Sequence, residues 1–69
     1  MGHLQDVDVF VFVQGVRRVW PKATVLGGKH LGFRIGVPGD PPEFLSGRHF
    51  TTWHAWYEAW QRAGADLRS

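Results

Sequence analysis

The sequence predicts a small α+β domain in which a helix is followed by two or three antiparallel strands and a second helix. Three observations support this order: helical apolar patterns near both ends, an alternating apolar pattern in the middle, and breaks rich in Pro and Gly between them. Both helices should pack on one face of the sheet, and the other face should stay open. A chain of 69 residues is long enough for one domain, which we assign to residues 1–69.

The N-terminal segment fits two structures. Residues 7–13 are mostly β-branched or aromatic, which favours a strand. The apolar residues also recur at helical spacing over a length too great for a typical strand, so we favour a helix from Gln5 to Trp20. Its buried face comprises Val9, Phe12, Val13, Val16, Val19 and Trp20. The helix leaves Val7, Phe10 and Val11 off that face, which suggests contact with a second copy or a host protein.

Two strands and a short third one are predicted in the middle of the chain. The apolar run 23–26 is followed by Gly27-Gly28, where we expect a sharp turn because glycine tolerates positive φ. Beyond the turn, apolar residues alternate with others, which is typical of a half-buried strand with Arg34 on the open face. The inward-facing residues are Leu31, Phe33, Ile35 and Val37. After the proline-rich run 38–42, residues 43–45 should form the third strand.

The C-terminal segment carries the clearest helical pattern, and we expect its aromatic stripe to pack in the core. The stripe comprises Trp53, Trp56, Tyr57, Trp60, Ala63 and Leu67. Thr51 or Thr52 can cap the N-terminus, because a hydroxyl oxygen can accept a hydrogen bond from a free amide. Gly64 can end the helix.

Charge and composition exclude several classes of protein. The absence of cysteine excludes a disulfide scaffold, a thiolate zinc site and a cysteine nucleophile. No apolar run reaches the length of a membrane helix and no signal-peptide pattern is found, so we expect a cytoplasmic protein without membrane contact. Basic residues outnumber acidic ones by eight to six, and no acid lies between Arg17 and Arg34. Such a stretch is usually a solvated face, and phosphate binding is the alternative.

The segment Gly27-Gly28-Lys29-His30 is the best candidate for chemistry. Two glycines let a backbone approach a phosphate, lysine adds charge, and histidine titrates near neutral pH and can transfer a proton. An ordinary β-turn is the alternative interpretation of the same residues. We expect His49 to be a loop residue or a second phosphate contact, and His54 to be exposed in the first turn of the last helix. We expect no metal or other cofactor.

The order of elements, together with three short segments, resembles the HicA (YcfA-like) mRNA interferase toxins of bacterial and phage toxin–antitoxin modules. The segments are Gly27-Gly28-Lys29-His30-Leu31, Phe33-Arg34-Ile35 and Gln61-Arg62-Ala63-Gly64. The resemblance covers roughly residues 5–67 and implies a fold similar to a double-stranded-RNA-binding domain. It also implies metal-independent cleavage of mRNA and a HicB-type antitoxin as partner.

The resemblance assigns His30 as the general acid/base and gives Gly28 and Lys29 the role of holding phosphate. Together with the basic stretch, the expected nucleic-acid contacts are Arg17, Arg18, Lys22, Gly28, Lys29, Arg34 and Arg48. Two alternatives remain open. One is a non-catalytic nucleic-acid-binding module, and the other is a small phage protein that binds a host protein.

Overall fold

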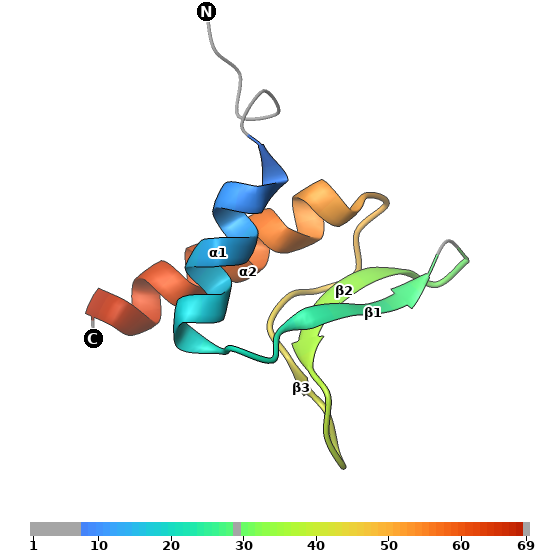
Figure 1. Cartoon of the computed structure of the whole chain (residues 1–69). Helices are drawn as coiled ribbons and strands as arrows, with labels where there is room; N and C mark the ends of the chain where they lie inside the picture. Colours follow the sequence, from blue (N-terminus) through green and yellow to red (C-terminus); the bar gives the residue numbers. More distant parts are fainter. Residues whose placement is uncertain (1–7, 29, 69) are drawn as a thin grey trace, which may run out of the picture.

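The computed structural model describes residues 8–28 and 30–68, with side chains described up to residue 64. Its elements are α1 (Val9–Val19), β1 (Thr24–Gly28), β2 (Gly32–Val37), β3 (Glu43–Phe44) and α2 (Thr52–Arg68). The strands form one antiparallel sheet in the order β1-β2-β3. The predicted α+β fold is therefore confirmed, and Figure 1 shows the β1–β2 hairpin projecting away from the two helices.

The first element is a helix, as favoured, but it begins later than predicted. Asp8 has an extended backbone, and its Oδ1 accepts a hydrogen bond from the amide of Phe10 at 2.9 Å. Asp8 is therefore the N-cap, and the predicted start at Gln5 is wrong. Residues 5–7, including the predicted contact residue Val7, lie outside the described residues. Phe10 and Val11 are exposed, as expected for residues off the buried face.

The last helix has the predicted N-cap but runs through its predicted end. Thr51 Oγ1 accepts a hydrogen bond from the amide of His54 at 3.1 Å. Gly64 was expected to end the helix, yet α2 continues to Arg68. Among the described glycines, the left-handed backbone that a glycine cap requires occurs only at Gly27 and Gly32.

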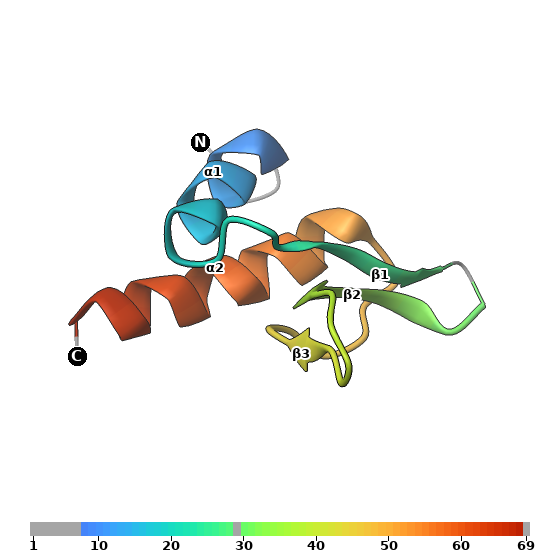
Figure 2. The ribbon, with the colours of Figure 1, turned by 60° about the horizontal axis from the view of Figure 1, so that its bottom comes forward.

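The core lies between the two helices and the inner face of the sheet. Phe12 of α1 is 2% exposed, because three aromatic rings of α2 surround it. Its centroid lies 5.1 Å from Trp53, 5.4 Å from Tyr57 and 5.1 Å from Trp60. Of the predicted stripe, Trp56 and Ala63 are buried, Trp60 is 38% exposed, and the side chain of Leu67 lies outside the described part. Two small residues that were not predicted, Ala55 and Ala59, are fully buried. These small residues allow close approach of α1, which crosses α2 in Figure 2.

The β1–β2 hairpin differs from its prediction at the turn. Gly27 pairs with Phe33 and Gly28 with Gly32, so the strand continues through both glycines, and His30 and Leu31 lie in the turn beyond it. The predicted turn at Gly27-Gly28 is therefore wrong. Leu31 is 67% exposed rather than inward-facing, because it lies in the turn before β2 begins.

After β3, the chain continues beside β2, held by backbone hydrogen bonds and by the side chain of Ser46. The amides of Leu45 and Ser46 both donate to the carbonyl of Ile35, and Ser46 Oγ accepts from the amide of Ile35 at 2.9 Å. His49 then pairs with Phe33 through both backbone groups. The loop that follows β3 is thus attached to β2 as far as the hairpin turn.

The two faces of the sheet have different roles. Ile35 is buried against the helices, and Phe33 and Val37 pack against the same core, as the alternation predicted. Arg34 pairs across the strands with Leu26, so both side chains lie on the opposite face. That face also carries Phe44 of β3, and these three side chains line a groove on it.

Candidate nucleic-acid interface at the β1–β2 hairpin

His30 lies at the tip of the β1–β2 hairpin, where its side chain is exposed. It lines a hollow of about 200 Å³ together with Arg48, His49 and Phe50 from the loop before α2. Residues 18 to 20 positions apart in sequence meet here because the Phe33–His49 bridge brings the loop to the hairpin. Sequence reasoning identified His30 and Arg48 but did not place them in one hollow.

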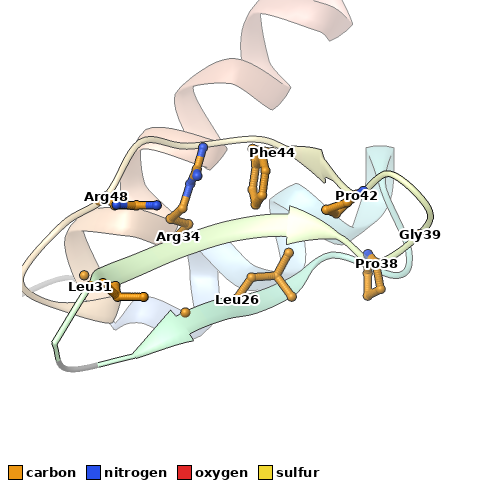
Figure 3. A pocket seen from close by; sticks show the side chains of 10 residues that line it. Leu26, Leu31, Arg34, Pro38, Gly39, Pro42, Phe44 and Arg48 are labelled. Carbon is orange, nitrogen blue, oxygen red and sulfur yellow. The ribbon is translucent and has the colours of Figure 1, made fainter.

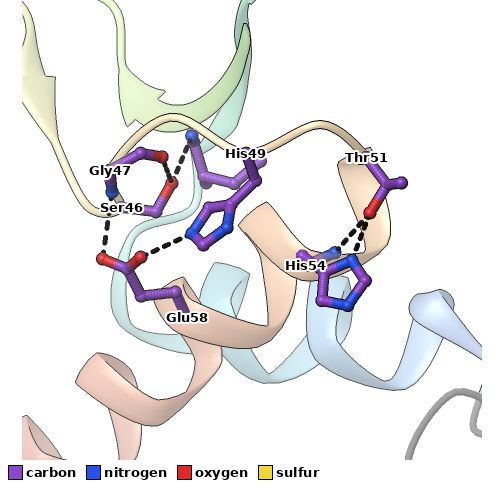
Figure 4. Close-up of polar contacts among 7 residues, drawn as sticks. Ser46, Gly47, His49, Thr51, His54 and Glu58 are labelled. Carbon is purple, nitrogen blue, oxygen red and sulfur yellow. Dashed lines mark hydrogen bonds and ion pairs between the residues drawn. The ribbon is translucent and has the colours of Figure 1, made fainter.

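His49 is held by a carboxylate. Its Nε2 atom lies 2.6 Å from Oε1 of Glu58 on α2, while Oε2 of Glu58 accepts the amide of Gly47 at 2.9 Å (Figure 4). The hydrogen bond with His49, followed by that from Gly47, lowers the pKa of the Glu58 carboxyl below its ordinary value. His49 is therefore a fixed residue of the hollow rather than a plain loop residue.

Phe50 is the most exposed large apolar side chain of the described part, at 99%. It follows His49 directly, at the rim of the same hollow. A single exposed apolar side chain is common, but an aromatic ring beside cationic groups is the usual platform for stacking a nucleobase. The sequence carried no signal for Phe50, because its exposure depends on where the loop leaves β2.

A larger groove of about 410 Å³ runs along the outer face of the sheet. Arg34 from β2 and Arg48 from the loop both line it, and Figure 3 shows the Arg34 side chain between Arg48 and Phe44. The guanidinium carbon of Arg34 lies 3.6 Å from the Phe44 ring centroid. Leu31, Gly32 and Arg48 line both the groove and the His30 hollow, so the two adjoin at these residues.

Three of the predicted phosphate contacts lie elsewhere. Arg17 is used within the fold: its Nε donates to the carbonyl of Ala23 at 3.0 Å, and its guanidinium lies 5.6 Å from the Trp56 ring centroid. Arg18 and Lys22 are exposed at the same end of the molecule. The five residues of β1, at about 3.4 Å each, separate this end from the hairpin tip by about 17 Å.

Of the two remaining predicted contacts, Gly28 belongs to the hairpin. Gly28 is the last residue of β1, and a Cβ atom there would have no heavy atom within 4 Å. A side chain at this position would therefore meet no described atom of the protein. Lys29 lies outside the described residues.

The described residues contain no group of three His, Asp, Glu or Cys side chains that could hold a metal ion. Within the same residues, neither helix has both the length and the apolar character needed to cross a membrane. The hollow therefore offers two imidazoles, one guanidinium and one aromatic ring as its chemical groups.

No protein-family model, curated protein or solved structure matches this chain.

Proposed function

We propose that the protein binds RNA at the hairpin tip and cleaves it without a metal ion, as the resemblance to HicA-type toxins implies. The observation that carries the proposal is the shared hollow of His30, Arg48, His49 and Phe50. It combines a proton-transferring group, a cation for phosphate and a ring for a base, which are the groups that this reaction needs. A HicB-type partner would inhibit the enzyme by covering His30.

The reaction moves two protons. His30 takes the proton from a ribose 2′-OH, whose oxygen attacks the adjacent phosphorus and forms a 2′,3′-cyclic phosphate. The bond from phosphorus to the 5′ oxygen breaks, and that oxygen leaves as a hydroxyl after receiving a proton. Arg48 neutralises the charge that develops on the phosphate.

His49 is the second proton-transferring group in this scheme. Because the Glu58 carboxylate only accepts hydrogen bonds, His49 Nε2 carries a hydrogen and donates a hydrogen bond to Oε1 of Glu58. Proton transfer then falls to the other ring nitrogen, Nδ1. When His49 is protonated, Nδ1 supplies the proton to the leaving 5′ oxygen.

The test uses end-labelled single-stranded RNA in excess EDTA, followed over time on a gel. Wild type should produce fragments that end in a 2′,3′-cyclic phosphate, and His30→Ala should not. Phe10→Ala is the control, since it removes an exposed side chain of α1 that does not line the hollow. Equal cleavage by wild type and His30→Ala would exclude His30 as the catalytic residue.

Binding is tested separately from cleavage by a mobility shift at several salt concentrations. Each phosphate contact releases counterions, so affinity should fall as salt rises. Arg48→Gln should reduce the slope of log K against log salt by about one unit. An affinity that does not change with salt would contradict the phosphate contacts.

A second candidate function is contact with a protein partner through α1. Phe10 and Val11 are 57% and 50% exposed and adjacent on the helix, which is the observation that favours it. Light scattering of the purified chain tests the homodimer form of this function. A dimer mass that Phe10→Asp converts to a monomer mass supports it, and a monomer mass at all concentrations contradicts it.

A further inference from the structure

The groove on the outer face of the sheet has a cationic centre at Arg34. One face of the guanidinium is stacked on the Phe44 ring at 3.6 Å, and the carbonyl of Phe44 is held at 3.1 Å by Arg62 of α2. In the described part of the chain, the Nε atom of Arg34 is buried and has no hydrogen-bond partner. A buried donor without an acceptor is unfavourable, and an anion that binds this guanidinium from the groove would break no existing hydrogen bond of Nε.

The charge of the groove selects an anion. Among the described residues that line it, Arg34 and Arg48 are the only charged ones. Guanidinium groups bind phosphate through paired hydrogen bonds, and stacking on a ring fixes the plane in which they do so. The groove thus combines two phosphate-binding groups, one of them already oriented.

The rest of the groove is apolar and has the size of a ligand site. Leu26, Leu31, Pro38 and Pro42 form its walls. A Cβ atom at Gly36 would lie 2.8 Å from Leu26 Cδ1 and 3.4 Å from Phe44 Cδ1, so the glycine lets these two side chains close over the strand. The volume of about 410 Å³ falls within the range of ligand pockets, roughly 300–1,000 Å³.

We propose that this groove binds one nucleotide of the RNA strand, next to the nucleotide that is cleaved. Its phosphate lies on Arg34 and Arg48, and its base packs against the apolar walls. Arg48, Leu31 and Gly32 line both the groove and the His30 hollow, so a strand can pass from one into the other. The inference rests on the proposed function, since it takes RNA as the source of the nucleotide.

The test measures affinity for a fluorescent 2′-O-methyl RNA hexamer, which cannot be cleaved through its 2′ oxygen. Arg34→Gln should weaken binding at least tenfold. Arg34→Lys is the matched control for charge; it should restore only part of the affinity, because lysine lacks the planar fork. Thermal melts and amide spectra of the variants establish that they are folded. Unchanged affinity in folded Arg34→Gln would overturn the inference.

A second arm identifies the ligand by its effect on amide resonances. The hexamer and adenosine monophosphate should both shift amides of residues 26, 34 and 44, and inorganic phosphate should shift them less. Equal shifts with phosphate alone would overturn the base contact. If adding the hexamer does not displace bound adenosine monophosphate from the groove, RNA is ruled out as the source of the bound nucleotide.

The two proposals fail separately. If wild type does not cleave RNA but Arg34→Gln still weakens hexamer binding, nucleotide binding in the groove is supported and the cleavage function is contradicted. If wild type cleaves RNA and Arg34→Gln binds the hexamer as tightly as wild type, nucleotide binding in the groove is contradicted and the cleavage function is supported.

Discussion

His49 and Glu58 form a 2.6 Å hydrogen bond between Nε2 and Oε1 that joins the loop after β3 to α2. The second carboxylate oxygen of Glu58 holds the amide of Gly47 on the same loop (Figure 4). One side chain thereby fixes both ends of a short segment that contains Arg48. Together with the backbone pairing of Phe33 and His49, this pair holds Arg48, which lines both the hollow and the groove.

Glu58→Gln should lower stability in a pH-dependent way. The pKa of Glu58 is lower in the folded protein than in the unfolded chain, so its contribution is present above about pH 4.3 and is lost as pH falls through the folded pKa. Because the side chain is 46% exposed, we expect a loss of only about 0.5–1 kcal/mol at pH 6. Denaturant unfolding at pH 6 and pH 3 measures it. Glu43→Gln on β3 is the control, and an equal Glu58→Gln effect at both pH values would contradict the linkage.

Gly27→Ala should destabilise the hairpin while Gly28→Ala should not. Gly27 has φ of +93°, and a Cβ atom there would lie 2.6 Å from the carbonyl oxygen of Gly32. We expect a loss of about 1–3 kcal/mol, because both the backbone conformation and the contact are unfavourable. Gly28 has ordinary φ and open space around it. Thermal melts of the two variants make the comparison, and similar midpoints would contradict the positive φ at Gly27.

Gly64→Ala should stabilise the protein. Gly64 lies inside α2, and a Cβ atom there would meet nothing within 4 Å, so alanine should add about 0.5–1 kcal/mol through its helix propensity. Gly15→Ala in α1 is the contrasting variant. Its Cβ atom would lie 2.6 Å from Cδ1 of Trp60, so the same gain is opposed by displacement of that ring. Denaturant unfolding should rank Gly64→Ala above Gly15→Ala, and the reverse order would be inconsistent with this packing.

Phe50→Ala should weaken RNA binding without affecting the fold. The side chain is 99% exposed, so we expect a stability change within about 0.5 kcal/mol. Loss of a stacking platform should cost about 1–3 kcal/mol of binding free energy per base. Fluorescence titration with the RNA hexamer measures the affinity. Phe10→Ala, at an exposed phenylalanine on α1, should bind as wild type does, and a comparable loss in both variants would argue against a specific role of Phe50.

Local patterns predicted the elements of this fold because their residues report directly on burial. The alternation of Phe33, Ile35 and Val37 placed the inner face of β2, and the helical spacing of Phe12 and Val16 placed the buried face of α1. A local apolar pattern does not indicate the residue at which a strand or helix begins or ends. Leu31 continued the alternation by sequence but lies beyond the strand, in the turn.

The candidate site was only partly predictable, because it depends on contacts between distant segments. His30 was identified by its residue type beside two glycines, and Arg34 by its place on the open face. His49 acquires its role from Glu58, nine residues away and on another element. Likewise, only the pairing of Phe33 with His49 brings Arg48 and Phe50 to the hairpin. Neither contact leaves a trace in local composition.

The packing of Phe12 against the rings of α2 also determines when the chain can fold during synthesis. Phe12 of α1 is covered only once α2 has been synthesised, since the rings of Trp53, Tyr57 and Trp60 surround it. A nascent chain that ends before α2 contains α1 and the strands but lacks the apolar face of α2 against which α1 packs. The domain is therefore expected to acquire its structure in one step once α2 has been synthesised, rather than element by element.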